Sequence, residues 1–169
     1  NKVEPLFYLD KKYPQRLKQC PDSPVMLYYK GNADLNNRKV ISIVGTRKAT
    51  EYGKQFCTEL LQHLQVHQPL IVSGLAYGID ICAHKESLKN NLQTVGVLAH
   101  GLDDLYPGQH RSTADKMLEQ GGLLSDYISE TNPDKENFPK RNRIVAGMCD
   151  AVIVVEAGIT GGALITAEI

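Results

Sequence analysis

Short apolar runs alternate with helical patterns along this sequence, and most of the runs end in a glycine-containing loop. The runs are Val40–Val44, Leu70–Ser73, Thr94–Leu98, Leu123–Ser125 and Ala151–Glu156. Segments this short, apolar at nearly every position and rich in β-branched residues, are typical of strands buried on both faces of a parallel sheet. Strands that alternate with helices in this way predict an α/β fold with a doubly wound, mainly parallel sheet and helices on both faces.

The chain length limits the number of domains. A chain of 169 residues can form one well-packed domain but not two full ones. Residues 1–38 are predicted to be an N-terminal extension, with a short helix near Tyr13–Lys18 and one added strand at Val25–Lys30. Residues 39–169 are predicted to form the main domain. We expect its C-terminal end to be incomplete, because the sequence stops at Ile169 within a predicted helix.

Three glycine loops follow predicted strands and begin at Gly45, Gly74 and Gly158. In doubly wound sheets, ligands bind beyond the carboxyl ends of the strands, so these loops are expected to line one groove. A tight turn before a helix also exposes backbone N–H groups that bind phosphate. We therefore expect free amides around Gly45–Arg47 and Gly74–Gly78, with Thr46 capping the helix that follows.

Cationic and aromatic residues gather in the segments predicted at this edge. The cations are Arg47, Lys48, Lys135, Lys140, Arg141 and Arg143, and the nearby rings are Phe138, Tyr77 and Tyr106. Lysine and arginine neutralise phosphates, and an exposed ring stacks a base for roughly 1–3 kcal/mol. The combination predicts a groove for a single strand of nucleic acid. The alternative, solvated surface cations around a Phe138 that plugs the core, stays open.

Composition and motif content argue against several other classes. Lys plus Arg and Asp plus Glu number 19 each, so any nucleic-acid binding must come from a local patch. The sequence contains no G-x-G-x-x-G, no P-loop motif and no G-x-S-x-G, which disfavours dinucleotide-binding enzymes, P-loop NTPases and α/β-hydrolases. It shows no signal peptide and no apolar run of bilayer length, so a cytoplasmic protein is expected.

No set of residues indicates catalysis or metal binding. Asp80 and His84, four apart on a predicted helix, are expected to form a structural pair, and His110 is expected at the surface. Glu156 ends the last strand beside the groove, where it could orient a nearby arginine or accept from a glycine-loop amide. The four cysteines are scattered and are expected to be reduced, packed thiols. No metal and no cofactor are predicted.

Six ordered motifs resemble the DNA-processing protein A family (DprA, also called Smf). They read I-V-G-T-R at Ile43–Arg47, S-G-L-A-Y-G-I-D at Ser73–Asp80, G-L-D-D-L-Y-P at Gly101–Pro107, G-G-L-L-S-D-Y at Gly121–Tyr127, N-F-P-K-R-N-R-I-V-A-G at Asn137–Gly147 and V-V-E-A-G at Val154–Gly158. The lead-in P-x-x-L-Y-Y-K-G at Pro24–Gly31 also fits. The resemblance therefore extends over most of the chain.

The resemblance implies an extended Rossmann-like domain that binds single-stranded DNA without consuming it, and so is not an enzyme. It also implies a homodimer that protects incoming DNA during natural transformation and promotes loading of the RecA recombinase. Carried over by motif, the DNA-binding residues would be Gly45, Thr46, Arg47, Lys48, Gly74, Tyr77, Gly78, Lys135, Phe138, Lys140, Arg141, Arg143 and Gly161. Arg47 is the expected phosphate ligand, because its planar fork suits phosphate geometry. Lys135 and Phe138 would follow as backbone cation and base stacker.

Two other functions remain open at this stage. Nucleotide phosphoribohydrolases of the lysine-decarboxylase-like family share the architecture and carry a P-G-G-x-G-T-x-x-E loop, which Gly161-Gly162 and Thr166–Glu168 echo loosely. A sensor of small nucleotides with the same fold is the third possibility.

The sequence also departs from the family pattern. Tyr77 stands where many DprA relatives have a basic residue, so this position loses one positive charge and gains an aromatic ring that could stack a base.

Overall fold

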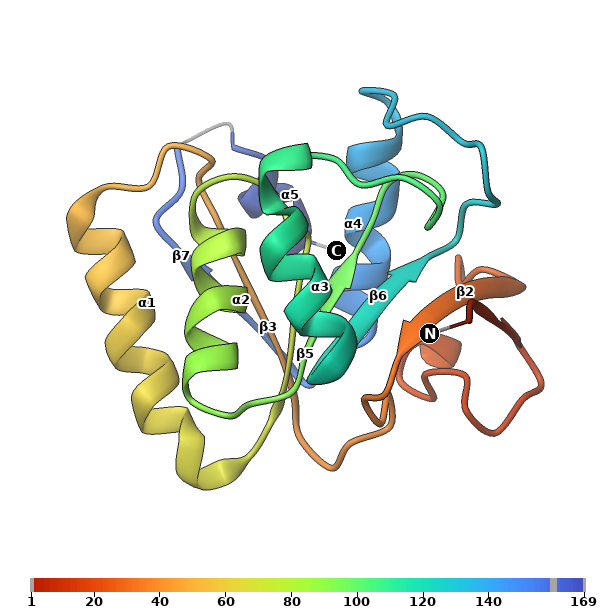
Figure 1. Cartoon of the computed structure of the whole chain (residues 1–169), viewed down its shortest axis with the longest axis horizontal. Coiled ribbons are helices and arrows are strands. Elements are labelled where there is room, and N and C mark those ends of the chain that lie inside the picture. Colours follow the sequence, from red (N-terminus) through yellow and green to blue (C-terminus); the bar gives the residue numbers. More distant parts are fainter. Residues whose placement is uncertain (1, 159–160, 169) are drawn as a thin grey trace.

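A computed structural model describes residues 2–158 and 161–168 of the chain. Its described strands form one seven-stranded sheet in the order β1-β2-β6-β5-β4-β3-β7 (Figure 1). The strands are β1 (Glu4–Phe7), β2 (Met26–Gly31), β3 (Val40–Gly45), β4 (Leu70–Ser73), β5 (Thr94–Val97), β6 (Gly121–Ser125) and β7 (Ala151–Val155).

The sheet is mainly parallel. Strands β6, β5, β4, β3 and β7 run parallel to one another, β2 pairs antiparallel with β6, and β1 pairs antiparallel with β2. The five parallel strands are the five predicted apolar runs, and β2 is the strand predicted in the lead-in. Strand β1 is not predicted, because four residues that include Pro5 give no periodic signal; it is held by pairing of Leu6 with Leu27.

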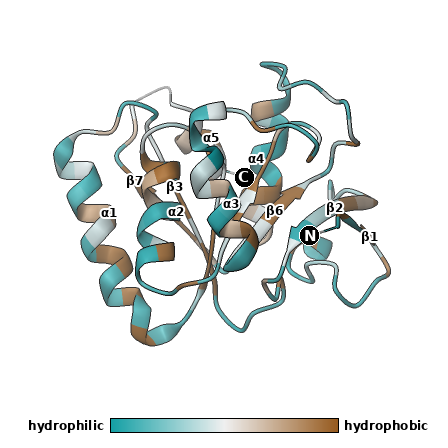
Figure 2. Cartoon of the chain, viewed as in Figure 1, coloured by the Kyte–Doolittle hydropathy of each residue, from teal (hydrophilic) through white to brown (hydrophobic). Residues whose placement is uncertain are grey.

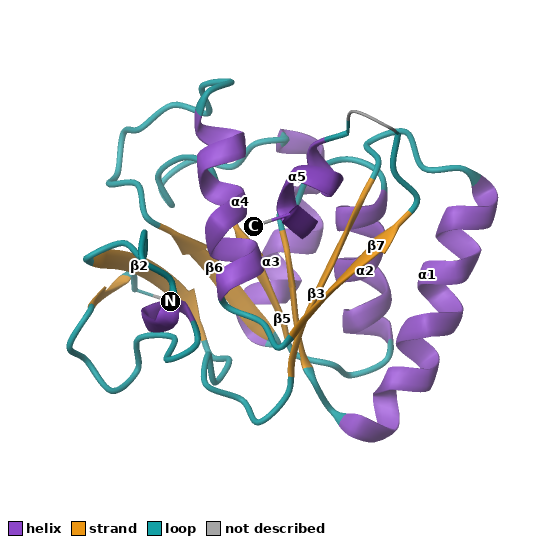
Figure 3. Cartoon of the chain, turned by 180° about the vertical axis from the view of Figure 1, so that it is seen from behind, coloured by secondary structure: helices purple, strands orange, loops and turns teal. Residues whose placement is uncertain are grey.

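Helices cover both faces of the sheet, as predicted for a doubly wound fold. The helices are α1 (Glu51–Leu64), α2 (Ile79–Lys89), α3 (Arg111–Glu119), α4 (Asn137–Gly147) and α5 (Gly162–Glu168). The first three lie on one face, and α4 and α5 lie on the other, as the opposite views show (Figures 1 and 3). Three short 3₁₀ turns complete the secondary structure: η1 (Leu17–Gln19), η2 (Gln65–His67) and η3 (Gly108–His110). The helix predicted near Tyr13–Lys18 is only the η1 turn.

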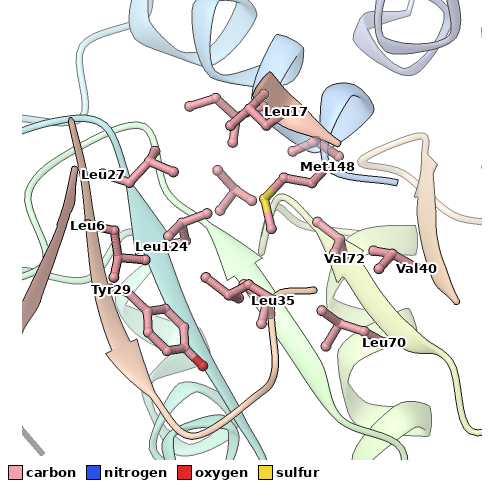
Figure 4. Packing of buried hydrophobic residues seen from close by; sticks show 14 of the residues in the cluster. Leu6, Leu17, Leu27, Tyr29, Leu35, Val40, Leu70, Val72, Leu124 and Met148 are labelled. Atoms are coloured by element: carbon pink, nitrogen blue, oxygen red, sulfur yellow. The ribbon is translucent and has the colours of Figure 1, made fainter. Parts of the chain in front are cut away.

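Apolar side chains fill both faces of the sheet. The central strands are mostly hydrophobic, whereas the helices mix hydrophilic and hydrophobic residues (Figure 2). On the α4 face, Met148 and Leu17 pack toward Val72, Leu124 and Leu27 of the sheet (Figure 4). Burying such a side chain stabilises the fold by roughly 1.5–3 kcal/mol. This packing fixes α4, which carries several of the predicted site residues, against the centre of the sheet.

Helix α1 begins at a threonine other than the predicted one. Thr50 is its N-cap, and the Thr50 hydroxyl accepts a hydrogen bond from the Gly53 amide at 3.1 Å. The Thr46 hydroxyl instead accepts from the Lys48 amide at 3.2 Å within the loop. The prediction that Thr46 caps the helix is wrong, because the loop after β3 runs four residues further before the backbone turns helical.

The switch point of the sheet lies between β3 and β7. Helix α1 follows β3 on one face, whereas α5 follows β7 on the other, so the chain leaves these neighbouring strands in opposite directions (Figures 1 and 3). Crevices that bind ligands form at such points in open α/β sheets. Among the described residues, none of the helices combines the length and apolarity needed to span a membrane.

Candidate functional site

A cavity of about 370 Å³ opens at the switch point, at the carboxyl ends of β3, β4 and β7. Its polar and glycine lining consists of Gly45, Thr46, Arg47, Gly74, Asp80, Lys135, Arg141, Asn142, Gly158, Gly161, Gly162 and Thr166. Phe138 and Ile165 contribute large apolar surface, and Ala163 and Val145 smaller ones. We refer to this space as the switch-point cavity. Its position agrees with the groove expected from the glycine loops.

The cavity brings together most of the predicted site residues, though not all of them. Those that line it are Gly45, Thr46, Arg47, Gly74, Lys135, Phe138, Arg141 and Gly161. Those that do not line it are Lys48, Tyr77, Gly78, Lys140 and Arg143. Three polar lining residues are not among the predicted site residues: Asp80, Asn142 and Thr166. Asn142 could have been found from its place between two predicted site arginines.

Arg47 is exposed at the cavity and keeps its charge available. Its guanidinium lies 5.5 Å from the centroid of the Phe138 ring, within cation–π range. None of the carboxylates in the described part of the chain forms an ion pair with it. An exposed guanidinium without a protein anion can bind an incoming one.

Arg141 is a buried cation at the floor of the cavity, with 4% of its surface exposed. It donates to the carbonyl oxygen of Gly74 at 2.8 Å and to that of Val97. Burial lowers the pKa of this guanidinium, and the nearby Asp80 charge partly offsets that effect. These hydrogen bonds hold the Arg141 side chain in place. Arg141 therefore contributes positive charge to the cavity and does not act as a mobile anion ligand.

Asp80 shares this floor. Its carboxylate accepts from the Gly74 amide at 3.1 Å; burial raises the pKa of Asp80, and the Arg141 charge lowers it in part. A Cβ on Gly74 would stand 2.6 Å from the Asp80 Oδ2 and 2.7 Å from an Arg141 nitrogen. Glycine at position 74 therefore lets Asp80 and Arg141 both approach the backbone of this residue.

Phe138 is half-buried among three side chains. Besides Arg47, the Arg141 guanidinium lies 6.0 Å from its ring centroid, and the Tyr106 ring centroid also lies at 6.0 Å. The alternative of Phe138 as a simple core plug does not fit these contacts, because its neighbours are polar or exposed. The ring is part of the cavity wall.

Arg143 points away from the cavity. It pairs with Asp126 at 2.6 Å and donates to the carbonyl oxygen of Asp22 at 2.7 Å. Its charge thus joins α4 to the end of β6 and to the N-terminal segment. The predicted clustering of Arg143 with the other cations is wrong, because helical spacing turns it away from Arg141, and Asp126 takes its charge.

Tyr77 and Gly78 stand beside the cavity and have structural partners. The Tyr77 ring packs at 5.0 Å against the ring of His110, and its hydroxyl bonds to Gln109. Gly78 has a φ of 78°, and a Cβ there would overlap the carbonyl oxygen of Thr46. Gly78 therefore lets the loop after β3 cross the start of α2.

Some of the amides expected to cradle a phosphate are used within the protein. The Thr46 amide donates to the Glu156 carbonyl oxygen at 2.8 Å, and the Gly74 amide donates to Asp80. The Lys48 amide donates to the Thr46 hydroxyl. The prediction of free amides is therefore wrong for Thr46 and Gly74.

Glu156 and the histidines also find specific partners. The Glu156 carboxylate accepts from the Thr50 amide at 2.9 Å, which fits the expected contact with the loop after β3 and not the contact with an arginine. His84 bonds to Thr94 and not to Asp80, so the predicted pair does not form. His110 is buried and bonds to the carbonyl oxygen of Leu75, contrary to the expected surface position.

The site offers charge and a ring, with few groups suited to bond breaking. Three cations (Arg47, Lys135 and Arg141) and one carboxylate (Asp80) line the cavity. Glu168, the acid of the loose hydrolase echo, is exposed and does not line it. Within residues 2–158 and 161–168, no cluster of three His, Cys, Asp or Glu side chains could hold a metal ion. The lining can bind an anion beside an aromatic surface.

A family model and several curated proteins match this chain. The model of the family described as DNA recombination-mediator protein A matches residues 4–169. The DNA processing protein DprA of Streptococcus pneumoniae is 41% identical over 160 residues, which cover 95% of this chain and 56% of the relative.

Solved structures are similar over the same region. The crystal structure of DprA from Streptococcus pneumoniae matches with a TM-score of 0.93 and 40% identity, over 99% of this chain and 59% of that one. DNA processing protein A from Helicobacter pylori, whose structure was described for its single-stranded DNA binding mode, matches with a TM-score of 0.89 and 30% identity, over 99% of this chain and 75% of that one. The chain spans about half the length of the curated relatives it matches.

Proposed function

The chain belongs to the DNA recombination-mediator protein A family, and we propose on this basis that it binds single-stranded DNA in the switch-point cavity. The observation that carries the proposal is the pair formed by Arg47 and Phe138. An exposed guanidinium that forms no ion pair within the described part of the chain lies 5.5 Å from an aromatic ring at the cavity. Cations that bind phosphates and aromatic rings that stack bases are the two kinds of group with which proteins hold single strands. The relative from Helicobacter pylori, described as binding single-stranded DNA, supports the same assignment.

Each side chain of the cavity has a distinct part in this proposal. Arg47 holds a backbone phosphate through its planar fork, and Lys135 neutralises a neighbouring one. Phe138 stacks a base. Arg141 adds fixed positive charge from the floor, where Asp80 compensates the cost of burying it.

The remaining predicted residues act around this centre. The glycines at positions 45, 74 and 161, with Thr46, bring the backbone close to the strand. Lys48 and Lys140, both exposed at the same edge, attract the strand without lining the cavity. Tyr77, Gly78 and Arg143 position the loops. We propose binding and not catalysis, because the described residues of the cavity lining offer cations and an aromatic ring but only one carboxylate.

The cellular role follows from the family. We propose that the protein protects incoming DNA in natural transformation and promotes loading of a RecA-type recombinase, in the cytoplasm and as a homodimer. The family description as a recombination mediator and the relative's name as a DNA processing protein support this role. Residues 39–169 are proposed as the DNA-binding domain and residues 1–38 as its extension. Sedimentation of the free protein tests the dimer, and RecA filament assembly on a coated strand tests the loading.

The central experiment compares two arginines that flank β3. Arg47 follows the carboxyl end of β3, and Arg38 precedes its other end; both are exposed. Affinity for a single-stranded oligonucleotide is measured across a salt series for the wild type, Arg47→Ala and Arg38→Ala. We expect Arg47→Ala to bind about tenfold or more weakly, with a salt slope shallower by about 0.7, the value for one lost single-strand phosphate contact. Arg38→Ala should bind like the wild type.

Equal affinity of the two variants for the oligonucleotide would refute the assignment of the cavity.

Two further experiments test the alternative functions. Incubation with nucleoside monophosphates tests the hydrolase alternative, because release of free base would show that the function is catalysis. Competition tests the sensor alternative: a mononucleotide that displaces a long strand at equal concentration would indicate a site for small nucleotides.

A further inference from the structure

A second aromatic ring extends the cavity wall toward β5. Tyr106 lies in the loop after β5, and 46% of its surface is exposed. It is not among the residues that line the switch-point cavity, yet its ring centroid lies 6.0 Å from that of Phe138. A large exposed ring beside the proposed nucleic-acid site either has no role in binding or makes a further contact with the ligand.

The backbone on both sides of Tyr106 is fixed. The neighbours Leu105 and Pro107 are buried, so the chain is anchored immediately before and after the exposed ring. The Tyr106 amide also donates to the Nε2 of the buried His100 at 3.2 Å. His100 is oriented for this by its Nδ1–H, which donates to the carbonyl oxygen of Gly101 at 2.8 Å. The ring is therefore presented to solvent by a rigid loop, which lowers the entropy lost when a ligand covers it.

The two rings are tilted with respect to each other. The planes of Tyr106 and Phe138 meet at 62°, an edge-to-face arrangement. A base stacked on each ring would therefore be inclined to its neighbour by a similar angle. Successive bases of a duplex stay parallel and paired, whereas those of a single strand can separate and turn independently.

We propose that Tyr106 is a second base-stacking residue and that, together with Phe138, it selects single strands by requiring two neighbouring bases to splay apart. This inference rests on the proposed function, since Phe138 must first hold a base. It assigns Tyr106 a role in specificity. Arg47 attracts the phosphates of any DNA, whereas the two tilted rings discriminate against the duplex.

The experiment measures binding to three ligands of equal length: a single-stranded oligonucleotide, the same strand with abasic sugars throughout, and a duplex. Tyr106→Ala should bind the ordinary single strand about five- to 150-fold more weakly, the range for one lost base stack. It should bind the abasic strand and the duplex as the wild type does. Tyr106→Phe, which keeps the ring, should retain wild-type affinity for all three ligands.

Phe56 provides a matched control for the loss of an exposed ring. It is 43% exposed on α1 and does not line the cavity. Phe56→Ala should leave binding of every ligand unchanged. Thermal denaturation of Tyr106→Ala checks that the loop change leaves the fold intact.

Three outcomes would overturn the proposal. Tyr106→Ala that binds the ordinary strand like the wild type shows that the ring holds no base. An equal loss on the abasic strand shows that the residue acts through the shape of its loop, and a loss in Tyr106→Phe assigns the effect to the hydroxyl. Arg47→Ala measured in parallel separates the two proposals: if it loses binding while Tyr106→Ala does not, the cavity stands and only the second ring is rejected.

Discussion

The Arg47 guanidinium lies 5.5 Å from the centroid of the Phe138 ring, although the two residues are 91 positions apart in the sequence. The proposed phosphate ligand and the proposed base stacker therefore touch in the protein without DNA. A cation over a ring is attracted by the electrons of its face, which holds Arg47 near the place where a base would stack. Binding of the phosphate and binding of the base are consequently linked.

This contact predicts that the effects of the two residues are not additive. Arg47→Ala and Phe138→Ala should each weaken single-strand binding, and the double variant should lose less than the sum of the two free energies. We expect a coupling of about 0.5–3 kcal/mol, the range for residues in contact. Affinities of all four proteins for one oligonucleotide measure it. Additivity within about 0.5 kcal/mol would mean that the two side chains act on separate nucleotides.

The floor of the cavity predicts a large loss of stability when its cation is removed. Arg141→Met would leave the buried Asp80 carboxylate without its compensating charge, which costs about 3–5 kcal/mol in comparable sites. Chemical denaturation should show this loss, and the double variant Asp80→Asn/Arg141→Met should recover part of it. Arg38→Met, at an exposed position, serves as control and should change the free energy of unfolding by less than about 0.5 kcal/mol. A small effect of Arg141→Met would show that Asp80 is already neutral in the folded protein.

The buried His84 should make the folded protein less stable in mild acid. The Thr94 hydroxyl donates to the Ile71 carbonyl oxygen at 3.1 Å, so its oxygen accepts from the His84 Nδ1–H at 2.7 Å. Within the described part of the chain, the buried Nε2 has no hydrogen-bond partner. Burial lowers the pKa of His84 to about 3, and the nearby His110 and Arg141 act in the same direction.

The sign of this effect follows from proton uptake. Between pH 6.5 and about 3 the unfolded chain binds a proton at this residue and the folded chain does not, so stability falls as the pH falls through that range. From pH 6.5 to 5 the free energy of unfolding should drop by about 2 kcal/mol on account of His84. The non-titrating variant His84→Gln should show a correspondingly flatter profile. Parallel pH profiles for the two proteins would exclude His84 as the source.

The backbone beside the site requires a glycine at position 78. Gly78→Ala should destabilise the protein, because the φ of 78° strains any residue with a Cβ and the Thr46 carbonyl oxygen occupies the space. Gly108, whose Cβ would meet no atom within 4 Å, is the matched control, and Gly108→Ala should leave the melting temperature nearly unchanged. Similar melting temperatures for the two variants would argue against the close crossing of the β3 loop and α2.

The sequence predicts the parts of the fold that depend on local pattern. The five parallel strands are continuous apolar runs, and the glycines that follow them mark the edge where the cavity lies. Strand β1 has no such pattern; its place depends on pairing with β2, about twenty residues later.

The individual roles of the cations could not be predicted in the same way. Arg141 and Arg143 are two residues apart in one basic segment, yet the first is buried under the cavity and the second pairs with Asp126. Which of them is taken up by a protein acid depends on how α4 packs against β6, and this is a property of the tertiary structure. The same holds for the buried His110 and for the amides of Thr46 and Gly74, whose partners come from other loops.

The pairing of β3 with β7 has a consequence for the order of events during synthesis. Ile41 pairs with Ala151, 110 positions later, and the two sides of the cavity come from these strands and the loops beyond them. A ribosome releases β3 long before β7 exists, and joining such distant segments requires closure of a long stretch of chain. The growing polypeptide therefore has no assembled cavity until nearly all of these residues have been made, so a half-made chain lacks the site proposed to bind DNA.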